Sequence, residues 1–420
     1  MLIKNAVYLT KNMKFEQGAL LIKNGKLSIV KPDMAIEGID EFDASGYIVL
    51  PGLINSHFHS YSPLAKGLVN EVPIQDWLDG SERGRLIATF FENPDDIITE
   101  EDFLAIGLYS YVEMLKQGIT FVSEADPGFS EQSMAETLAK LGLRGMIDTH
   151  SNYPSYHGTK VGNINFATHL LEEEDITEET LQECVRMKEE YNPLMMTHCM
   201  ENSWRRDLIH ESFGKSSVEL YAEKGLLDDK TVLYHGVHLS DRDIKLIKHN
   251  GANVVHCPVS NLWSGAGAAN VKGMLEAGVN VCIGTDYAST DIWEEMRTAY
   301  LLLKLNSDVG QFSAEDIWRM ATVNGAKAFQ LENEIGEISD GFRADLIFIK
   351  KDPSLHPLIN TSTFSTYAHN LLMHGKNGHV RHVMVDGMWI MKDGAILTVD
   401  EEKVQREYMR VARKLFNVDR

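Results

Sequence analysis

Residues 47–59, YIVLPGLINSHFH, decide the fold class and carry the first functional signal. The run is mostly apolar and ends in two histidines, His57 and His59, spaced two residues apart. On a β-strand, alternate side chains point to the same face, so this spacing aims both imidazoles at one point. Two imidazoles on one face can bind a single metal ion. The pair alone is a weak motif, because solvent-facing or core-bonded histidines produce the same pattern.

Seven further apolar runs follow this one, and segments with helical spacing separate most of them. The eight runs are 52–59 (GLINSHFH), 120–125 (TFVSEA), 145–150 (GMIDTH), 164–170 (INFATHL), 194–199 (LMMTHC), 232–236 (VLYHG), 253–258 (NVVHCP) and 279–286 (VNVCIGTD). The helix candidates are 100–118, 130–142, 176–191, 241–251 and 270–278. Eight buried strands alternating with helices predict an α/β protein with a (β/α)8 TIM-like barrel. An open doubly wound sheet is the alternative, because alternation alone does not establish closure.

The ends of these runs show a second regularity. Most of the runs end in or beside a polar or ionisable residue: His57 and His59, Glu124, His150, His169, His198, His235, His256 and Asp286. In a (β/α)8 barrel, the C-terminal ends of the strands surround one mouth, and the active site is built there. We therefore expect these side chains to gather around that mouth.

Three of these side chains, with one neighbour, carry a further chemical signal. His198 is followed three residues later by Glu201, and a carboxylate beside a metal ligand can move protons without binding the metal. His235 ends the sixth run, and Asp286 ends the eighth, where a buried carboxylate needs a metal, a cation or hydrogen bonds. Nitrogen and oxygen ligands without cysteine indicate a catalytic site with open positions, for zinc or another divalent metal.

Three other strand-end residues have two interpretations each. His256 could contact a substrate or order the seventh loop, and we favour the second. Glu124 and Asp126, in the segment SEADPG, could place negative charge at the mouth of the pocket or bond to the backbone, and both interpretations stay open.

The sequence pattern at both ends of the chain differs from the pattern in the middle. Short strand-like runs separated by Gly, Asn and Asp fill residues 1–50 and return in 336–400. We expect these segments to form one small β-sandwich, flanking a barrel over 51–335. Residues 401–420 begin with an amphipathic pattern that predicts a C-terminal helix.

Composition narrows the function classes. The chain has 420 residues, with 61 acidic against 40 basic side chains and a formal net charge of −21. Such a charge disfavours nucleic-acid and membrane-surface binding. Four cysteines without a CxxC pair, no signal-type segment and no long apolar run predict a soluble, cytoplasmic protein.

Several segments, taken together, resemble the amidohydrolase superfamily, in particular its cytosine-deaminase-like branch. That branch includes guanine, adenosine and S-adenosylhomocysteine deaminases and triazine hydrolases. The segments are YIVLPGLINSHFH, THCMEN, VLYHGVHLS, VVHCPVSNLWSGAG, GVNVCIGTDYAS with EEMRTAYLLLK, GFRADLIFI and VRHVMVDGMWI, so the resemblance runs nearly end to end.

This resemblance implies a fold, a metal and a set of roles. It implies an elliptical barrel with a β-sandwich from both chain ends, and one divalent metal, most often Zn²⁺ but also Fe²⁺ or Mn²⁺. The implied metal ligands are His57, His59, His198 and Asp286. A single metal fits because INFATHL lacks the lysine that bridges two metals in binuclear relatives. The implied catalytic residues are Glu201, His235 and Asp286.

The resemblance also implies a reaction, in which metal-bound hydroxide attacks a ring carbon and ammonia leaves. The substrate would be an amino-substituted N-heterocycle of purine, pyrimidine, pterin or triazine type. His169 matches a substrate-contacting histidine, while Trp77 in the first loop and Tyr287 after the metal aspartate are further candidate substrate contacts. The alternative is a chlorohydrolase-like enzyme that removes a halide or alkylamine, or one that opens a cyclic amide or imine. A catalytically silent metal-binding protein is disfavoured because Glu201 is retained. Relatives form homodimers or larger homo-oligomers.

Overall fold

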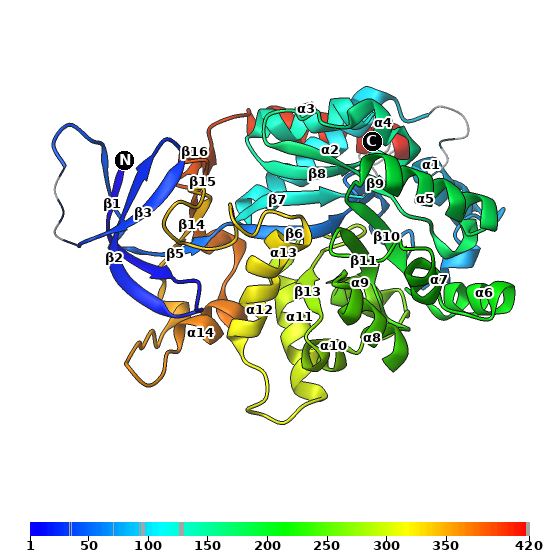
Figure 1. The fold of residues 1–420 in the computed structure, drawn as a ribbon. Helices are drawn as coiled ribbons and strands as arrows, with labels where there is room; N and C mark the ends of the chain where they lie inside the picture. Colours follow the sequence, from blue (N-terminus) through cyan, green and yellow to red (C-terminus); the bar gives the residue numbers. More distant parts are fainter. Residues whose placement is uncertain are drawn as a thin grey trace.

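The computed structural model describes residues 1–32, 34, 36–69, 71–91, 93, 97–125 and 130–416. Figure 1 shows two parts side by side: a small sheet in which blue N-terminal and orange C-terminal strands meet, and a larger barrel with helices around it. The barrel contains all of the candidate metal ligands.

The eight predicted runs form eight parallel strands that pair in chain order. They are β6 (Leu53–Phe58), β7 (Ile119–Glu124), β8 (Arg144–Asp148), β9 (Ile164–His169), β10 (Met195–Cys199), β11 (Thr231–His235), β12 (Asn253–His256) and β13 (Asn280–Ile283). An isolated parallel bridge between Phe58 and Asp286 links the last strand segment back to the first. This link confirms the barrel and rules out the open doubly wound sheet.

The barrel strands are apolar along most of their length because both of their faces are buried. Val255 points into the barrel with inner residues of the other strands, such as Ile54 and Met196. Its neighbour Val254 points outward, into the core between strands and helices. The interior is therefore packed with side chains, and only the ends of the barrel are open to ligands.

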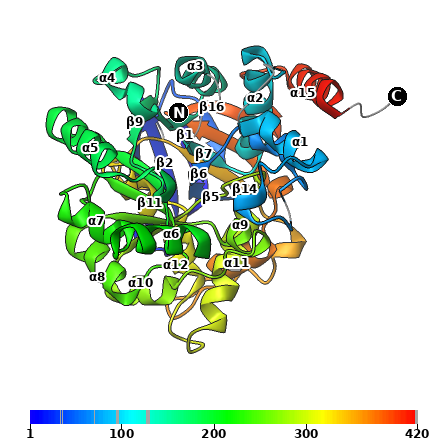
Figure 2. The same cartoon turned by 90° about the vertical axis from the view of Figure 1, so that its right-hand side faces the viewer.

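The five predicted helices are all confirmed. They correspond to α2 (Glu100–Lys116), α3 (Glu131–Leu141), α5 (Glu178–Tyr191), α8 (Asp241–Asn250) and α10 (Val271–Ala277). The chain fixes their starts with capping side chains: the hydroxyls of Thr99 and Ser240 accept from backbone N–H groups of the first turns of α2 and α8. Figure 2 shows the helices forming a ring around the strands. Across the described residues, every helix is too short or too polar to traverse a lipid bilayer.

The chain ends form one mixed nine-stranded sheet. Its strands are β1 (Leu2–Leu9), β2 (Phe15–Lys23), β3 (Lys26–Val30), β4 (Glu41–Asp43) and β5 (Tyr47–Pro51), then β14 (Leu346–Lys350), β15 (Val380–Val385), β16 (Met388–Lys392) and β17 (Ala395–Ile396). The two ends join where β14 pairs antiparallel with β5. The pairing confirms that a separate β unit is built from both termini.

Period-two alternation buries both faces of this sheet. Ile48 and Leu50 of β5 face the core shared with the barrel, whereas Val49 faces the sheet's own core together with Phe348. We propose that 1–50 and 336–400 form one folding unit beside the barrel of 51–335. The strand β6 begins at Leu53, directly after β5 ends at Pro51, so the sheet lies toward the N-terminal strand ends and leaves the opposite mouth free (Figure 1).

The predicted C-terminal helix is α15 (Glu401–Phe416). It packs on α2, where the rings of Tyr408 and Tyr109 stack with centroids 3.8 Å apart. The side chains of Arg410 and Lys414 pair with the buried carboxylate of Asp102. Helix α15 is therefore fixed to the barrel by stacking and by charge.

Candidate metal centre and active site

Five of the predicted site residues meet at the C-terminal mouth of the barrel. His57 lies on β6, His59 directly follows that strand, and His198 lies on β10. His235 ends β11, and Asp286 lies three residues beyond the end of β13. Strands that are far apart in the chain thus bring these side chains to one place, as the strand-end pattern predicts.

The distances between ligand-type atoms are short. The Oδ1 atom of Asp286 lies 2.8 Å from His57 Nε2, 3.5 Å from His59 Nε2 and 4.0 Å from His235 Nε2. The Nε2 atoms of His59 and His198 are 3.3 Å apart. One ligand atom from each of four residues lies within 4.8 Å of all the others: His57, His198, His235 and Asp286.

This donor set fits one divalent metal ion. The Nε2 atom of His235 is buried and has no hydrogen-bond partner, although buried polar atoms normally have one, and the buried Nε2 atom of His57 faces a carboxylate oxygen of Asp286 at 2.8 Å. A metal ion at their common point would satisfy them. Imidazole nitrogens with one carboxylate oxygen suit zinc and several other first-row metals.

Local electrostatics favour the metal-binding protonation states of His57 and Asp286. Burial lowers the pKa of His57 well below its ordinary value, so its imidazole is neutral. Burial acts to raise the pKa of Asp286, but His235 and His57 outweigh it and hold that pKa well below its ordinary value. Neutral imidazoles and an ionised carboxylate are the forms that bind metals.

Two of the five residues have an unusual backbone. His235 has φ of 68° and Asp286 has φ of 58°, in the left-handed region that side chains with a Cβ rarely adopt. Such strain persists only where surrounding contacts hold it, and it concentrates at functional sites. At Asp286 the backbone N–H donates to the His57 carbonyl oxygen at 2.9 Å, which fixes the carboxylate beside the histidine pair.

The approach of these two strands depends on Gly284. A Cβ placed there would lie 2.7 Å from the Cβ and 2.9 Å from the backbone nitrogen of His57. Gly284→Ala is therefore expected to push β13 and β6 apart, lowering the free energy of unfolding by about 1–3 kcal/mol and weakening metal binding. Urea unfolding and metal titration measure both effects. The control is Gly310→Ala, where a Cβ meets no atom within 4 Å, and equal effects of the two changes would contradict the argument.

Hydrogen bonds from neighbouring elements orient the candidate ligands. On α9 (Pro258–Trp263), Asn261 Oδ1 lies 2.8 Å from His235 Nδ1, and the Ser260 hydroxyl donates to Asp286 Oδ2. His198 Nδ1 lies 2.7 Å from Glu172 Oε1. Partners of this kind fix the ring orientation and tautomer of ligand histidines.

Glu172 also links the metal centre to the candidate proton-transfer residue. Its second oxygen lies 2.9 Å from the Nη1 atom of Arg205, a buried residue of α6 (Ser203–Phe213). The same Nη1 atom lies 3.0 Å from Glu201 Oε2. Burial acts to raise the pKa of Glu172, but His198 and Arg205 outweigh it and hold that pKa well below its ordinary value. One cation therefore holds two carboxylates, one against a ligand histidine and one at the mouth.

Removing the charge of Glu172 should loosen the site. Glu172→Gln is expected to lower metal affinity about 10- to 100-fold, the usual effect of losing such a supporting partner. Competition with a chelator of known affinity measures it. Glu174→Gln is the matched control, because Glu174 also pairs with Arg205, at 2.6 Å, but its recorded contacts include no histidine. Equal affinities in the two variants would show that the contact with His198 has no effect.

His169 is bonded on both ring nitrogens. Its Nδ1 atom lies 2.7 Å from Asp148 Oδ2, and its Nε2 atom lies 3.1 Å from Glu172 Oε1. Burial acts to lower the pKa of His169, but the two carboxylates raise it to about 10. Its predicted role as a substrate contact stays a prediction, and a substrate would have to displace Glu172 to reach it. Asp148, His150 and His169 also lie close enough to hold a metal, but these carboxylates already occupy His169.

Trp77 and Tyr287 form an aromatic wall beside the metal centre. Their ring centroids are 5.9 Å apart, and Tyr287 lies at the same separation from His59. The indole N–H of Trp77 donates to the Val72 carbonyl oxygen at 2.9 Å, which anchors the first loop. Both residues are thus placed to contact a substrate, and that role stays a prediction.

Glu124 is tied to its surroundings. Its carboxylate accepts from the backbone N–H of Ser60 at 2.9 Å and from the Tyr111 hydroxyl at 2.8 Å. These bonds favour a structural role over charge at the mouth. Asp126 lies outside the described residues.

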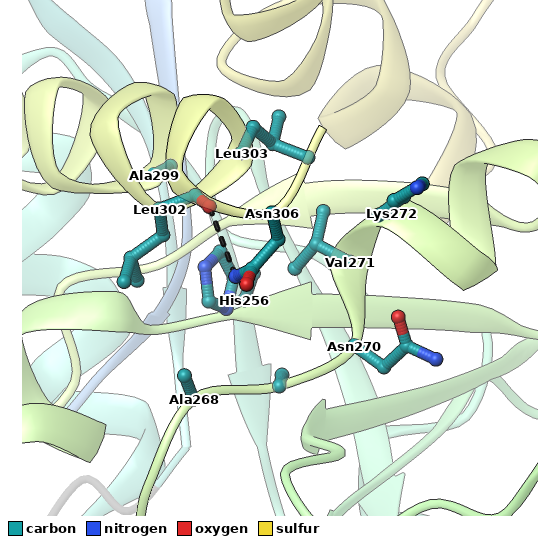
Figure 3. A pocket seen from close by; sticks show the side chains of 10 residues that line it. His256, Ala268, Asn270, Val271, Lys272, Ala299, Leu302, Leu303 and Asn306 are labelled. Atoms are coloured by element: carbon teal, nitrogen blue, oxygen red, sulfur yellow. Dashed lines mark hydrogen bonds between the residues drawn. The ribbon is translucent and has the colours of Figure 1, made fainter. Parts of the chain in front are cut away.

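His256 is not part of the four-residue cluster of ligand-type atoms. It lines a separate cavity of about 330 Å³ between α10 and α11 (Ile292–Leu305), where Figure 3 shows it behind Asn306 and near Val271. Burial lowers the pKa of its imidazole to about 3. This placement agrees with ordering of the seventh loop, because α9 begins two residues later and carries Ser260 and Asn261.

Sequence reasoning missed the supporting residues. Glu172 and Glu174 lie in the acidic run EEED after His169, and Arg205 follows Glu201 by one helical turn. An acidic run beside a predicted ligand and a possible i,i+4 pair were the available signals. For Ser260 and Asn261, the only available signal was that two polar residues stand together in the segment PVSN.

Comparison with known proteins finds a matching family model and similar chains. Residues 48–390 match the model of the amidohydrolase family. A protein from Acetivibrio thermocellus named 5-methylthioadenosine/S-adenosylhomocysteine deaminase is 30% identical over 99% of both chains.

Two solved structures have the same fold. A zinc-bound adenosine deaminase from Xanthomonas campestris has a TM-score of 0.88 and 20% identity, over 99% of this chain and 98% of that one. A zinc complex of atrazine chlorohydrolase from Arthrobacter aurescens has a TM-score of 0.86 and 20% identity, over 98% and 99%. At this identity the likeness concerns the fold alone.

Proposed function

The chain belongs to the amidohydrolase family and is a hydrolase of carbon–nitrogen bonds, and from this premise we propose that it deaminates an adenosine-type nucleoside. The observation that carries the proposal is the convergence of His57, His198, His235 and Asp286 at the mouth of the barrel. Glu201 is linked to this cluster through Arg205 and Glu172. The relative named for two adenosine derivatives supports the choice of nucleoside. Deamination replaces the ring amino group by oxygen from water and releases ammonia.

We propose that the site holds one zinc ion on His57, His59, His198 and Asp286. A divalent ion at such a site makes water acidic enough to supply hydroxide near pH 7. Zinc has no redox chemistry and accepts this mixture of imidazole and carboxylate ligands, and iron(II) or manganese(II) are the alternatives.

Each remaining group has a proposed role in moving protons or orienting water. Asp286 accepts a proton from the attacking water and passes it to the departing amino group, because an amide anion is a very poor leaving group. Glu201 donates a proton to the ring nitrogen next to the reacting carbon, so that negative charge does not accumulate there. It is reprotonated by the hydroxyl proton that the attacking oxygen loses when the carbonyl forms and ammonia leaves. His235, held at Nδ1 by Asn261, turns Nε2 toward the attacking oxygen and orients it.

Ammonia release from a panel of heterocycles tests the proposed reaction. We expect adenosine-type nucleosides to release ammonia with the highest kcat/KM, above guanine, cytosine, a pterin and an amino-triazine. Chloride release from a chloro-triazine is measured in parallel, because a chlorohydrolase-like activity is the alternative. The proposal would be contradicted if the chloro-triazine released chloride while no compound of the panel released ammonia.

A further inference from the structure

An aromatic cavity opens beside the candidate proton-transfer residue. Its volume is about 480 Å³, and Glu201 forms part of its wall. Three of the six tryptophans of the chain line it: Trp77 from the first loop, Trp204 on α6 and Trp263 at the end of α9. Because Trp77 packs on Tyr287 and Tyr287 packs on His59, the cavity adjoins the metal centre.

The charged residues of this cavity are all acidic. Among the described residues that line it, Glu71 and Glu201 are the charged side chains, and no lysine or arginine is present. The two arginines of the adjoining helix α6 are both paired with carboxylates. Arg205 pairs with Glu172, Glu174 and Glu201. Arg206 pairs with Asp207 at 2.7 Å.

This distribution of charge discriminates between substrates by the substituent at the end far from the reacting amino group, which we call the substrate arm. Indole rings offer large apolar contact areas, so an apolar group gains free energy by leaving water there. A carboxylate would lose part of its hydration without meeting an unpaired cation in the lining, and it would lie near the like charge of Glu71. A free amino group could pair with Glu71, but the carboxylate of an amino-acid arm would have no partner.

We propose that this cavity is the subsite for the substrate arm that lies far from the reacting amino group, and that it selects an uncharged, apolar arm. Of the two nucleosides in the name of the relative, the methylthio arm of 5′-methylthioadenosine fits this chemistry. The amino-acid arm of S-adenosylhomocysteine does not. The inference rests on the proposed deamination of an adenosine-type nucleoside and adds to it the chemical class of the 5′ substituent.

Two measurements on the full chain test the selectivity. Ammonia release gives kcat/KM, and quenching of tryptophan fluorescence in the metal-depleted protein gives Kd without turnover. We expect 5′-methylthioadenosine to exceed S-adenosylhomocysteine by at least about 10-fold in both. If both nucleosides are deaminated with equal kcat/KM, or the second is preferred, the proposed function stands and the subsite inference is wrong. If neither is bound or deaminated, both are wrong.

A charge series at one position tests the cause of the selectivity. Glu71 is exposed, and the variants Glu71→Gln and Glu71→Arg change its charge from negative to neutral to positive. We expect the preference for the methylthio arm to fall stepwise, by about 10-fold or more between wild type and Glu71→Arg. Glu183→Arg, on the exposed face of α5, makes the same change of net charge away from the cavity and should leave the preference unaltered. An unchanged preference across the Glu71 series would overturn the inference.

Discussion

Glu201→Gln is expected to lower kcat by about 10²- to 10⁴-fold, the range that a well-placed proton donor contributes, while the metal content stays the same. Glutamine keeps the size and polarity of the side chain but cannot donate an acidic proton. Because Glu201 is not among the four residues whose ligand-type atoms cluster, the metal should remain bound. Stopped assays of ammonia release and elemental analysis of the same preparation measure the two quantities.

The matched control is Glu174→Gln, which also removes one carboxylate from Arg205. If rearrangement of Arg205 caused the loss, both variants would lose comparable activity. A Glu201→Gln enzyme with kcat near that of the wild type, or one that has lost its metal in parallel, would refute the proton-transfer role.

Asp286→Asn is expected to abolish measurable turnover and to lower metal affinity strongly. The change removes the carboxylate that lies within 4.0 Å of three imidazole nitrogens, and an amide can neither supply the negative charge nor accept the proton. Metal titration followed by activity assays at saturating metal separates the two losses. Near-normal turnover at full occupancy would show that Asp286 has no role in proton transfer.

Glu295→Gln is the control for a buried carboxyl group near the site. Burial raises the pKa of Glu295 well above its ordinary value, which favours its uncharged form, so an amide of the same shape is expected to change little. We expect metal content and turnover close to those of the wild type. This contrast distinguishes a charged ligand from a neutral structural acid.

The sequence predicts the barrel and its metal centre because both depend on local patterns. Apolar runs that end in ligand-type residues specify strands, and the topology of parallel strands places their ends together. The sequence therefore predicts that His57 and Asp286 lie close together, although they are far apart in the chain. The sequence predicts a proton-transfer role for His235. It does not predict that the Nε2 atom of His235 lies in the same tight cluster as the ligand atoms.

The supporting network could not be predicted in the same way. Glu172 and Arg205 lie on different elements, and their significance comes from one guanidinium that pairs with several carboxylates in space. His169 was expected to contact substrate, yet its environment holds two carboxylates that only the fold brings to it. Side-chain pairing across elements depends on packing that periodicity does not encode.

The most direct test of the whole account is the metal content of the purified protein, measured by elemental analysis on the wild type and on His57→Ala and His198→Ala. The account predicts about one divalent ion per chain in the wild type, little in either variant, and no ammonia release after chelation until the metal is restored. A metal-free preparation that still releases ammonia at the wild-type rate would contradict it.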